Sequence, residues 1–425
     1  MKADLALYGG ERAIAPGSMK PWPPVDEADR ELVLASLEST EHSFGPNCRA
    51  FQEEFAAWNG NRFAITTNSG TAALHMGVAA CGCGAGDEVI VPAYSWSSSV
   101  TCVLQHNAIP VFVDIDFDTM LVDPARIEAA ITPNTKAILV VHLHGLMVDM
   151  ERIMDIARRH GLRVIEDCCQ AHGATFKGRQ CGTWGDCAAF SCNQNKLLCS
   201  GEGGMFVTDD EALYRDAQAL WSFGETRSPV EERDYHAYAL GWMYRNNDLT
   251  AAFGRGQLRK LDGHLAQIEE NANALHEGLL GTPGLILPTV PANCRHNWYN
   301  YVVRFDMEAL GHAHAPGRYR DRLLEAFRAE GAEVGVWQRF ILPAMTVFQA
   351  RNAYGNGCPW GCPHARPVRY APEDYPVAAR HCDTHACIIM ALRPPNGPGL
   401  AEATARAIRK VMDNVNHIEL DEAVA

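Results

Sequence analysis

Short apolar segments alternate with helical segments between residues 62 and 208, and this alternation constrains the fold more than any other feature of the chain. Apolar residues recur at three- and four-residue spacing in 70–82, 123–131 and 149–161, which predicts amphipathic helices. Strands separated by helices form mostly parallel sheets that the helices cover. We therefore predict an α/β fold built on a mostly parallel sheet of seven strands. The predicted strands cover residues 62–68, 88–93, 109–115, 136–145, 163–168, 187–193 and 203–208.

Toward the C-terminus the alternation gives way to a different pattern, which predicts a second domain. A helical stretch at 248–280 leads to a predicted strand at 297–306 and a predicted helix at 316–331. We expect a large domain over residues 1–250, with an N-terminal arm, and a smaller C-terminal α+β domain over residues 251–425.

The amino-acid composition limits the kinds of molecule that the protein is expected to bind. The net charge of −14 argues against a nucleic-acid-binding protein, whose surface is usually basic. No window approaches the roughly 18 apolar residues of a membrane span, and the first residues lack the apolar core of a signal peptide. Fifteen cysteines are an odd number, and Cys168, Cys187 and Cys192 fall inside predicted strands, so a disulfide framework is not expected. We expect a cytoplasmic protein that acts on small molecules.

Polar residues gather where four of the predicted strands end. They occupy 67–71, 94–96, 166–172 and 191–196. In sheets of this kind, ligands bind at the carboxyl ends of the strands, where loops and helix N-termini meet. The four polar segments are therefore expected to lie around one site.

The segment SGTAALHMG is typical of an anion site. Gly70 permits close approach of the backbone, and the first N–H groups of the following helix, with the Thr71 hydroxyl, can bind a phosphate. The alternative is an ordinary helix cap, since serine and threonine begin many helices.

Three further side chains at strand ends suggest the rest of the chemistry. Lys196, one of only seven lysines among 37 basic residues, could form a Schiff base if its amine were made neutral. Asp167 ends an apolar run, where a carboxylate needs a cationic partner such as a protonated pyridine nitrogen or an arginine. Trp96 could offer a flat face to a planar ring. A surface lysine, a loop-capping aspartate and a core tryptophan are the alternatives; together, however, the residues match the needs of pyridoxal phosphate.

The chain resembles the DegT/DnrJ/StrS family of sugar aminotransferases over about residues 20 to 415. The resemblance rests on many separate blocks in the family order. It implies the fold type I architecture of pyridoxal-phosphate enzymes, a homodimer with active sites at the subunit interface, and transfer of an amino group from glutamate or glutamine. The blocks are TNSGTAAL, VIVPAYSWSSS, VDIDFDT, VHLHGLMVDM, VIEDCCQAHGA, AAFSCNQNKLLCSGEGGM and LGWMYRNNDLTAAFGRGQL.

The resemblance assigns a role to each candidate residue. It makes Lys196 the Schiff-base lysine and proton shuttle, and Asp167 the carboxylate that holds the pyridine nitrogen. Gln170 falls near the phenolic oxygen of the cofactor, and Trp96 falls where the family places its stacking aromatic residue. The phosphate-contact positions are Gly70, Thr71, Ser191 and Asn193.

Arg245 resembles an arginine that reaches into the active site of the neighbouring subunit and meets a substrate carboxylate. Two residues before it, many members carry an asparagine that contributes to the phosphate site across the dimer, whereas this chain has Met243. Asn246 and Asn247 are the candidates to replace that asparagine.

The amino-group acceptor is expected to be an uncharged keto-cyclitol such as a scyllo-inosose, with glutamine as donor, in the biosynthesis of a secondary metabolite such as an antibiotic. A nucleotide-linked keto-sugar carries a diphosphate that needs cations, and only two lysines follow residue 250. The segments HLHG, GEGG and CPWGCPH also resemble members from aminocyclitol antibiotic pathways. The nucleotide-linked keto-sugar stays open as the alternative acceptor.

Two other functions remain possible from the sequence. A cysteine- and histidine-rich segment has some zinc-like spacing, but packing of a Pro-rich loop and buried thiols explain it more simply, and we therefore expect no metal. A noncatalytic relative that keeps the fold is the other, against which Lys196 and Asp167 argue. The cysteines and histidines concerned are Cys358, Cys362, His364, His381, Cys382, His385 and Cys387.

Overall fold

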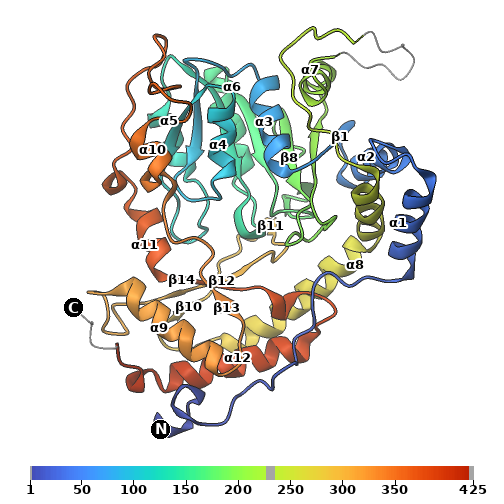
Figure 1. The fold of residues 1–425 in the computed structure, drawn as a ribbon. Helices are drawn as coiled ribbons and strands as arrows, with labels where there is room; N and C mark the ends of the chain where they lie inside the picture. The colour runs from blue at the N-terminus through green and yellow to red at the C-terminus, as the bar shows by residue number, and fades with distance from the viewer. Residues whose placement is uncertain (1, 226–234, 421–425) are drawn as a thin grey trace.

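A seven-stranded sheet forms the centre of the N-terminal half in the computed structural model, which describes residues 2–225 and 235–420 (Figure 1). The strand order is β1-β9-β8-β5-β4-β2-β3, and all neighbours are parallel except β9, which runs antiparallel to β1 and β8. This confirms the mostly parallel sheet and its seven strands. The strands are β1 (Phe63–Thr67), β2 (Glu88–Pro92), β3 (Ile109–Val113), β4 (Thr135–Val141), β5 (Arg163–Asp167), β8 (Cys187–Ser191) and β9 (Gly204–Thr208).

The register of the sheet brings the ends of its strands together. Val141 at the end of β4 lies opposite Asp167 at the end of β5, and Ser191 at the end of β8 lies opposite Gly204 at the start of β9. The predicted strand at 136–145 stops at Val141 because His144 adopts φ 59°, a left-handed conformation that a strand cannot contain. The chain therefore turns away at this edge and leaves room for other residues.

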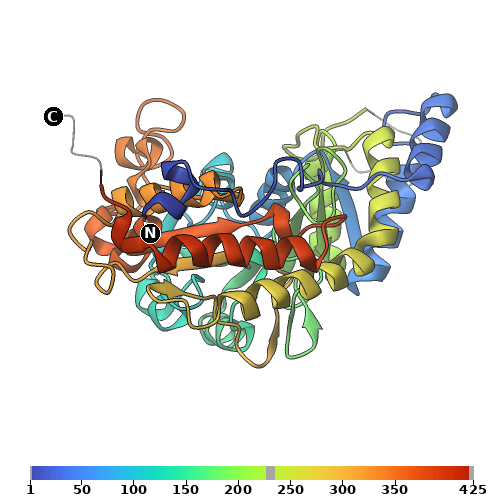
Figure 2. The ribbon, with the colours of Figure 1, turned by 90° about the horizontal axis from the view of Figure 1, so that it is seen from below.

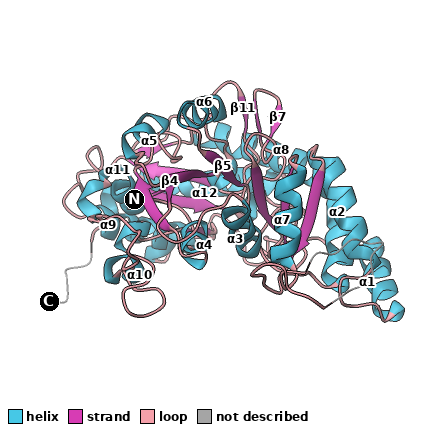
Figure 3. Cartoon of the chain, turned by 90° about the horizontal axis from the view of Figure 1, so that it is seen from above, coloured by secondary structure: helices cyan, strands magenta, loops and turns pink. Residues whose placement is uncertain are grey.

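Helices cover both faces of the sheet. Figure 3 shows α3, α4 and α7 on one side and α5 and α6 on the other. The helices predicted over 70–82, 123–131 and 149–161 are confirmed as α3, α5 and α6; α4 was not predicted, because it is short and begins in a serine-rich segment. The helices of this half are α1 (Glu27–Ser39), α2 (Pro46–Asn59), α3 (Gly70–Ala80), α4 (Ser98–Gln105), α5 (Pro124–Ala130), α6 (Met150–His160) and α7 (Glu211–Trp221).

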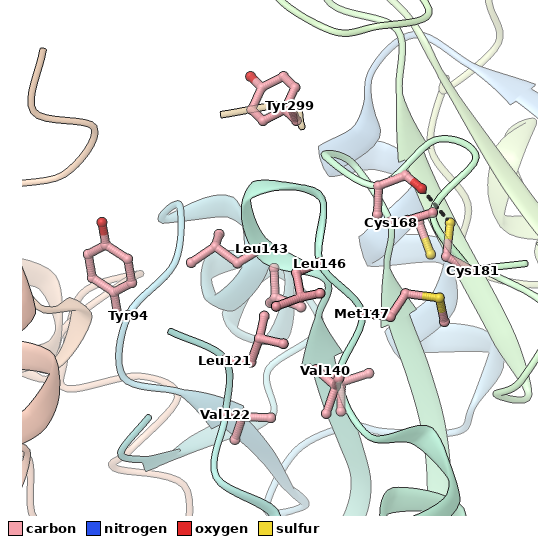
Figure 4. Close-up of a cluster of buried hydrophobic side chains, with 14 of the residues drawn as sticks. Tyr94, Leu121, Val122, Val140, Leu143, Leu146, Met147, Cys168, Cys181 and Tyr299 are labelled. Atoms are coloured by element: carbon pink, nitrogen blue, oxygen red, sulfur yellow. Dashed lines mark hydrogen bonds between the residues drawn. The ribbon is translucent and has the colours of Figure 1, made fainter. Parts of the chain in front are cut away.

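The hydrophobic core lies between the sheet and these helices. The strands are buried almost throughout, as expected of a sheet covered on both faces. In Figure 4, Val140 and Met147 belong to the cluster beneath the loop that carries Leu143 and Leu146, and Tyr299 lies apart above that loop. The core thus fixes the loops at the carboxyl ends of β4 and β5 from below.

A second sheet belongs to the C-terminal half. Its strand order is β10-β12-β14-β13, and every neighbouring pair is antiparallel. A small three-stranded sheet pairs β11 with β6 and β7. The strands are β10 (Leu285–Ile286), β12 (Tyr301–Phe305), β13 (Val334–Gly335), β14 (His385–Ile388), β6 (Thr175–Phe176), β7 (Arg179–Gln180) and β11 (Cys294–Arg295). The remaining helices are α8 (Asp248–Leu279), α9 (Pro316–Ala329), α10 (Thr346–Ala350), α11 (Pro376–Thr384) and α12 (Pro398–Asp413).

The long helix α8 connects the two halves. It packs against α1 and α2 at one end and against α12 at the other, and Figure 2 shows α8 in yellow beside α12 in red. The predicted domain boundary at residue 250 falls near the start of α8, and it stays a prediction. Among the described residues, none of these helices combines the length and the apolar character that crossing a bilayer requires.

The N-terminal segment lies along the C-terminal half. The backbone N–H of Ile14 donates to the carbonyl of Glu330, and the N–H of Lys20 donates to Asn396 Oδ1 at 2.9 Å. The segment then reaches the loop after β8, where Trp22 Nε1 donates to the carbonyl oxygen of Lys196 at 3.1 Å. Residues far apart in the sequence therefore meet around Lys196.

Candidate active site

A cavity of about 310 Å³ opens where the strands of the large sheet end. All eight residues that the sequence predicts to contact the cofactor line it, and they come from the segments that follow β1, β2, β5 and β8. The structure thus brings these residues together, while their individual roles stay predictions. They are Gly70, Thr71, Trp96, Asp167, Gln170, Ser191, Asn193 and Lys196.

One side of the cavity is the N-terminus of α3. Ser69 caps the helix by accepting a hydrogen bond from the N–H of Ala72 at 3.1 Å, and the N–H groups of Gly70 and Thr71 in the first turn have no intrahelical acceptor. A Cβ at position 70 would lie 2.8 Å from Ser191 Cβ, so only glycine fits here. The close approach creates a lined recess with free N–H donors, which suits a phosphate group.

Asp167 lies deeper in the cavity wall and is only 4% exposed. Its carboxylate accepts hydrogen bonds from Ser99 Oγ at 2.7 Å and from the N–H of Cys169 at 3.0 Å, and Ser95 Oγ contacts Ser99 Oγ. Among the described residues, no lysine, arginine or histidine nitrogen lies within 4.0 Å of it. A buried carboxylate without a cation is costly, so this side chain is arranged for a cationic ligand.

Lys196 follows β8, and its amine faces the cavity. Its Nζ lies 5.0 Å from the centre of the Tyr299 ring, a cation–π contact. Its backbone is held by two hydrogen bonds: the N–H donates to the carbonyl of Asn193, and the carbonyl accepts from Trp22 Nε1. Within 2–225 and 235–420, no carboxylate pairs with its amine. The backbone is thus fixed, while the side chain is left to act on a ligand.

The polar groups around Lys196 are oriented by their neighbours. Gln170 Oε1 accepts from the N–H of His144 at 2.8 Å, which leaves the amide nitrogen of Gln170 to donate elsewhere. Asn193 Nδ2 donates to Glu202 Oε1 at 2.9 Å. Nearby, burial lowers the pKa of His172 to about 3, with the charge of Lys196 as a second cause, so this imidazole is neutral at physiological pH.

Comparison with known proteins identifies the family. The model of the DegT/DnrJ/EryC1/StrS aminotransferase family matches residues 23–361. An L-glutamine:scyllo-inosose aminotransferase from Streptomyces griseus is 35% identical, with 98% of this chain and 100% of that protein covered. GDP-perosamine synthase from Caulobacter vibrioides is also 35% identical, with 92% and 96% covered. The X-ray structure of the aminotransferase from Psychrobacter cryohalolentis superposes with a TM-score of 0.79 at 30% identity, covering 94% of this chain and 100% of that one.

The chain belongs to the DegT/DnrJ/EryC1/StrS aminotransferase family. It is a pyridoxal-phosphate-dependent aminotransferase, as the sequence predicted.

The residues of this DegT-family cavity fit the cofactor. The recess at Gly70 and Thr71 supplies N–H donors for a phosphate, and Asp167 supplies a buried carboxylate with no cation of its own for a protonated pyridine nitrogen. Lys196 points its amine into the same space, and Trp96, which is exposed, borders it. A ligand that carries a phosphate, a basic ring nitrogen and a carbonyl would match these features.

Arg245 is the predicted residue that the structure does not bring to the cavity lining of its own chain. Its guanidinium lies 5.3 Å from the centre of the Phe223 ring. Met243 exposes half of its surface, and its carbonyl accepts from Asn68 Nδ2 at 3.3 Å. Asn246 and Asn247 both engage the start of α8 through Thr250, so neither points freely toward the cavity from this chain.

Several cavity residues escaped the sequence analysis. Ser99 lies in the first turn of α4, at the end of the serine-rich segment PAYSWSSS, and no spacing in that segment distinguishes it as the serine that donates to Asp167. Tyr299 and Trp337 come from the C-terminal half, where no motif distinguishes them. Ser95 and Cys169 fall inside the predicted polar segments 94–96 and 166–172 but were not singled out, and Glu202 lies outside those segments.

The zinc-like cluster does not assemble. Of the cysteine, histidine and acidic residues that the structure describes, only His142, Glu166 and Cys168 bring three potential ligand atoms within 4.8 Å of one another. Glu166 there accepts from His142 Nε2 at 2.8 Å and from the backbone N–H groups of Gly182, Trp184 and Gly185. Because the Glu166 carboxylate accepts four hydrogen bonds, its structural role explains its burial: it joins β5 to the loop before β8.

Proposed function

We propose that the protein transfers an amino group from glutamine to a free keto-cyclitol of the scyllo-inosose type. The observation that carries this proposal is the charge of the cavity: among its described lining residues, Lys196 is the one lysine or arginine. A diphosphate of a nucleotide-linked sugar would require several cations, whereas a cyclitol needs none. The Streptomyces griseus relative, whose name gives both glutamine and scyllo-inosose, supports the same acceptor and donor.

The proposed chemistry uses the groups around the cavity in fixed roles. Pyridoxal phosphate, when bound, supplies a ring that accepts the electron pair of the broken Cα–H bond of the donor. Lys196 would hold the cofactor covalently, and its amine, when free, would remove the α-proton of the donor. Asp167 keeps the ring nitrogen protonated, and Ser99 and the N–H of Cys169 hold its carboxylate in place. The α3 N-terminus, with Ser191 and Asn193, binds the phosphate.

We also propose that the enzyme is a homodimer with shared active sites, located in the cytoplasm and serving a secondary-metabolite pathway such as aminocyclitol antibiotic biosynthesis. The position of Arg245 outside its own cavity supports a role in the neighbouring site. Mixing inactive Lys196→Ala with inactive Arg245→Ala subunits is expected to restore part of the activity, since one hybrid site receives both wild-type residues. No recovery despite proven subunit exchange would contradict shared sites.

A nucleotide-linked keto-sugar is the second candidate acceptor, because GDP-perosamine synthase is as similar to this chain as the cyclitol enzyme is. The experiment is to convert the bound cofactor to its amino form with glutamine and then to offer each acceptor, while the return of the original absorbance is followed. We expect free inososes to restore it. If only a nucleotide-linked keto-sugar does so, the cyclitol proposal is wrong and the aminotransferase assignment stands.

A further inference from the structure

The chain just before α8 is a short extended segment, held by isolated antiparallel bridges to the end of β1 and to the residue after α7. Side chains of an extended chain alternate between its two sides. The rings of Trp242 and Tyr244 both contact a histidine of α3, whereas Met243, which lies between them, exposes half of its surface. Arg245 therefore lies on the same side of the segment as Met243, away from α3.

His75 is the histidine of α3 that holds this segment. Its Nδ1 lies 2.8 Å from the hydroxyl of Tyr244, and its Nε2 lies 3.1 Å from Nδ1 of His106. The Trp242 ring meets the imidazole edge-on, with the two ring centres 4.5 Å apart. Burial, with the charge of His106 as a second cause, lowers the pKa of His75 to about 4, so the ring is neutral at physiological pH. One nitrogen of a neutral imidazole donates and the other accepts, so both contacts form hydrogen bonds at once.

The helix that carries His75 also begins the phosphate recess of its own cavity. The recess starts at Gly70, and the N–H of Asn68, just before it, donates to the carbonyl of Tyr244 at 2.8 Å. Among the described residues, however, neither His75 nor Arg245 lines the cavity of its own chain. The imidazole thus faces the extended segment and not the recess, which separates its contacts from those of the cofactor residues.

We propose that His75 is a positioning residue for the neighbouring active site: through Tyr244 and Trp242 it holds the segment that presents Arg245 to the partner subunit. This rests on the shared active sites of the proposed function, and it adds the residue that fixes the arginine in place. His75→Leu keeps a side chain of similar volume but removes both hydrogen bonds, so the segment is free to shift. Because a displacement of about 1 Å in a substrate-binding group can lower a rate about 100-fold, we expect this variant to lose about 10- to 100-fold in activity.

The test determines in which of the two sites His75 acts. His75→Leu subunits are mixed with an equal amount of inactive Lys196→Ala subunits, so random exchange makes about half of the dimers hybrids. In each hybrid, one site takes Lys196 from the His75→Leu subunit and Arg245 from the subunit with an intact His75. If His75 acts on the neighbouring site, this hybrid site is complete, and the mixture should reach about a quarter of wild-type activity. If His75 only supports its own cavity, the mixture should show about half the activity of the His75→Leu enzyme.

Two control mixtures separate this proposal from the proposed function. Asp167→Asn should not be complemented by Lys196→Ala subunits, because Asp167 and Lys196 line the same cavity. Arg245→Ala should be complemented by them. If Arg245→Ala is not complemented although the subunits have exchanged, the shared active sites are wrong and this proposal is wrong with them. If Arg245→Ala is complemented and His75→Leu is not, only the role of His75 is overturned.

Two milder variants keep the test decisive if His75→Leu does not fold. Tyr244→Phe removes only the hydroxyl that bonds to His75, so it should lower activity about three- to tenfold and should also be complemented by Lys196→Ala subunits. His75→Gln, whose amide can still bond to that hydroxyl, should keep more activity than His75→Leu. Equal losses in the two His75 variants, or a Tyr244→Phe defect that Lys196→Ala subunits do not relieve, would overturn the proposal.

Discussion

Asp167 and Arg393 are buried charges of opposite sign: Asp167 lines the cavity on the side of the large sheet, and Arg393 lies behind Tyr299 on the side of the C-terminal half. Asp167 ends β5 at the edge of the large sheet, and Arg393 follows the last strand of the C-terminal sheet. Neither has an ion-pair partner in the described part of the chain, although burying an unpaired ion costs several kcal/mol. The comparison teaches that each side of the site buries a charge that no oppositely charged side chain of the described residues neutralises, and we propose that the sheet wall binds the cofactor.

Substitutions in the two walls should slow different half-reactions. A residue of the sheet wall acts in both half-reactions, because each uses the cofactor. A residue of the C-terminal wall should affect mainly the substrate that it contacts. The predictions that follow test this distinction, beginning with the largest expected effect.

Replacing Asp167 with Asn should slow α-proton removal by about 10²- to 10³-fold, because the ring nitrogen loses its charge partner. The cofactor should remain bound through the phosphate recess, and both half-reactions should slow together. Stopped-flow absorbance with glutamine, and then with the aminocyclitol, measures this. Near-normal rates would show that the carboxylate has only a structural role.

Buried histidines of both halves of the chain should make the protein sensitive to acid. Burial lowers the pKa of His172 and of His296 to about 3 and the pKa of His385 to about 4. The unfolded chain takes up these protons below about pH 6.5, whereas the folded chain does not until about pH 4. Stability should therefore fall as the pH decreases from 6.5 toward 4, by about 1.4 kcal/mol per pH unit for each histidine.

Urea unfolding at pH 5.0, 5.5 and 6.0 measures how the free energy of unfolding changes with pH. His172→Asn and His296→Asn should each lower the number of protons taken up on unfolding by about one. If neither variant changes this pH dependence, the two imidazoles are not neutral in the folded protein.

Replacing Trp337 with Leu should weaken the acceptor half-reaction by about tenfold and leave the donor half-reaction nearly unchanged. Trp337 lines the cavity, and the centre of its ring lies 5.0 Å from that of His144 and 6.2 Å from that of Trp96, so we expect it to offer a flat apolar surface to the proposed cyclitol. Kinetics with each substrate varied separately provide the test. An equal loss in both half-reactions would place Trp337 with the cofactor wall instead.

Replacing Ser99 with Ala should have the smallest effect, about three- to tenfold in both half-reactions. The change removes one hydrogen bond to Asp167, worth about 1 kcal/mol, without altering its charge. Ser98→Ala is the matched control, because Ser98 lines the same cavity but makes no hydrogen bond to Asp167 in the structure. Equal effects of the two changes would count against a positioning role for Ser99.

The difference between the walls also explains what the sequence could predict. The sheet wall was predictable because its residues follow strands, and parallel strands end at a common edge; Lys196, Asp167 and Gly70 needed only that local context. Tyr299 and Trp337, which form the C-terminal wall, and Arg393, which lies behind Tyr299, come from separate segments whose meeting depends on tertiary packing. Arg393 in particular is one of thirty arginines, and only its burial without a carboxylate partner among the described residues distinguishes it.

Local conformations account for the smaller misses in the fold. The strand predicted to continue to residue 145 ends early because His144 takes a left-handed conformation, which apolar periodicity cannot reveal. The N-terminal segment was expected simply as an arm of the large domain, yet it brings Trp22 against the loop of Lys196. Contacts between residues that lie so far apart in the chain leave no repeating pattern in the sequence.

The central claim, that Lys196 carries the cofactor at the edge of the large sheet, is tested most directly by covalent trapping. Reduction of the cofactor-loaded protein with borohydride fixes pyridoxal phosphate to the lysine that holds it, and peptide mapping by mass spectrometry then locates the label. We predict one label per chain, in the peptide that contains Lys196. A label on Lys177 or Lys136, or no labelled lysine in a protein that had bound the cofactor, would contradict the account.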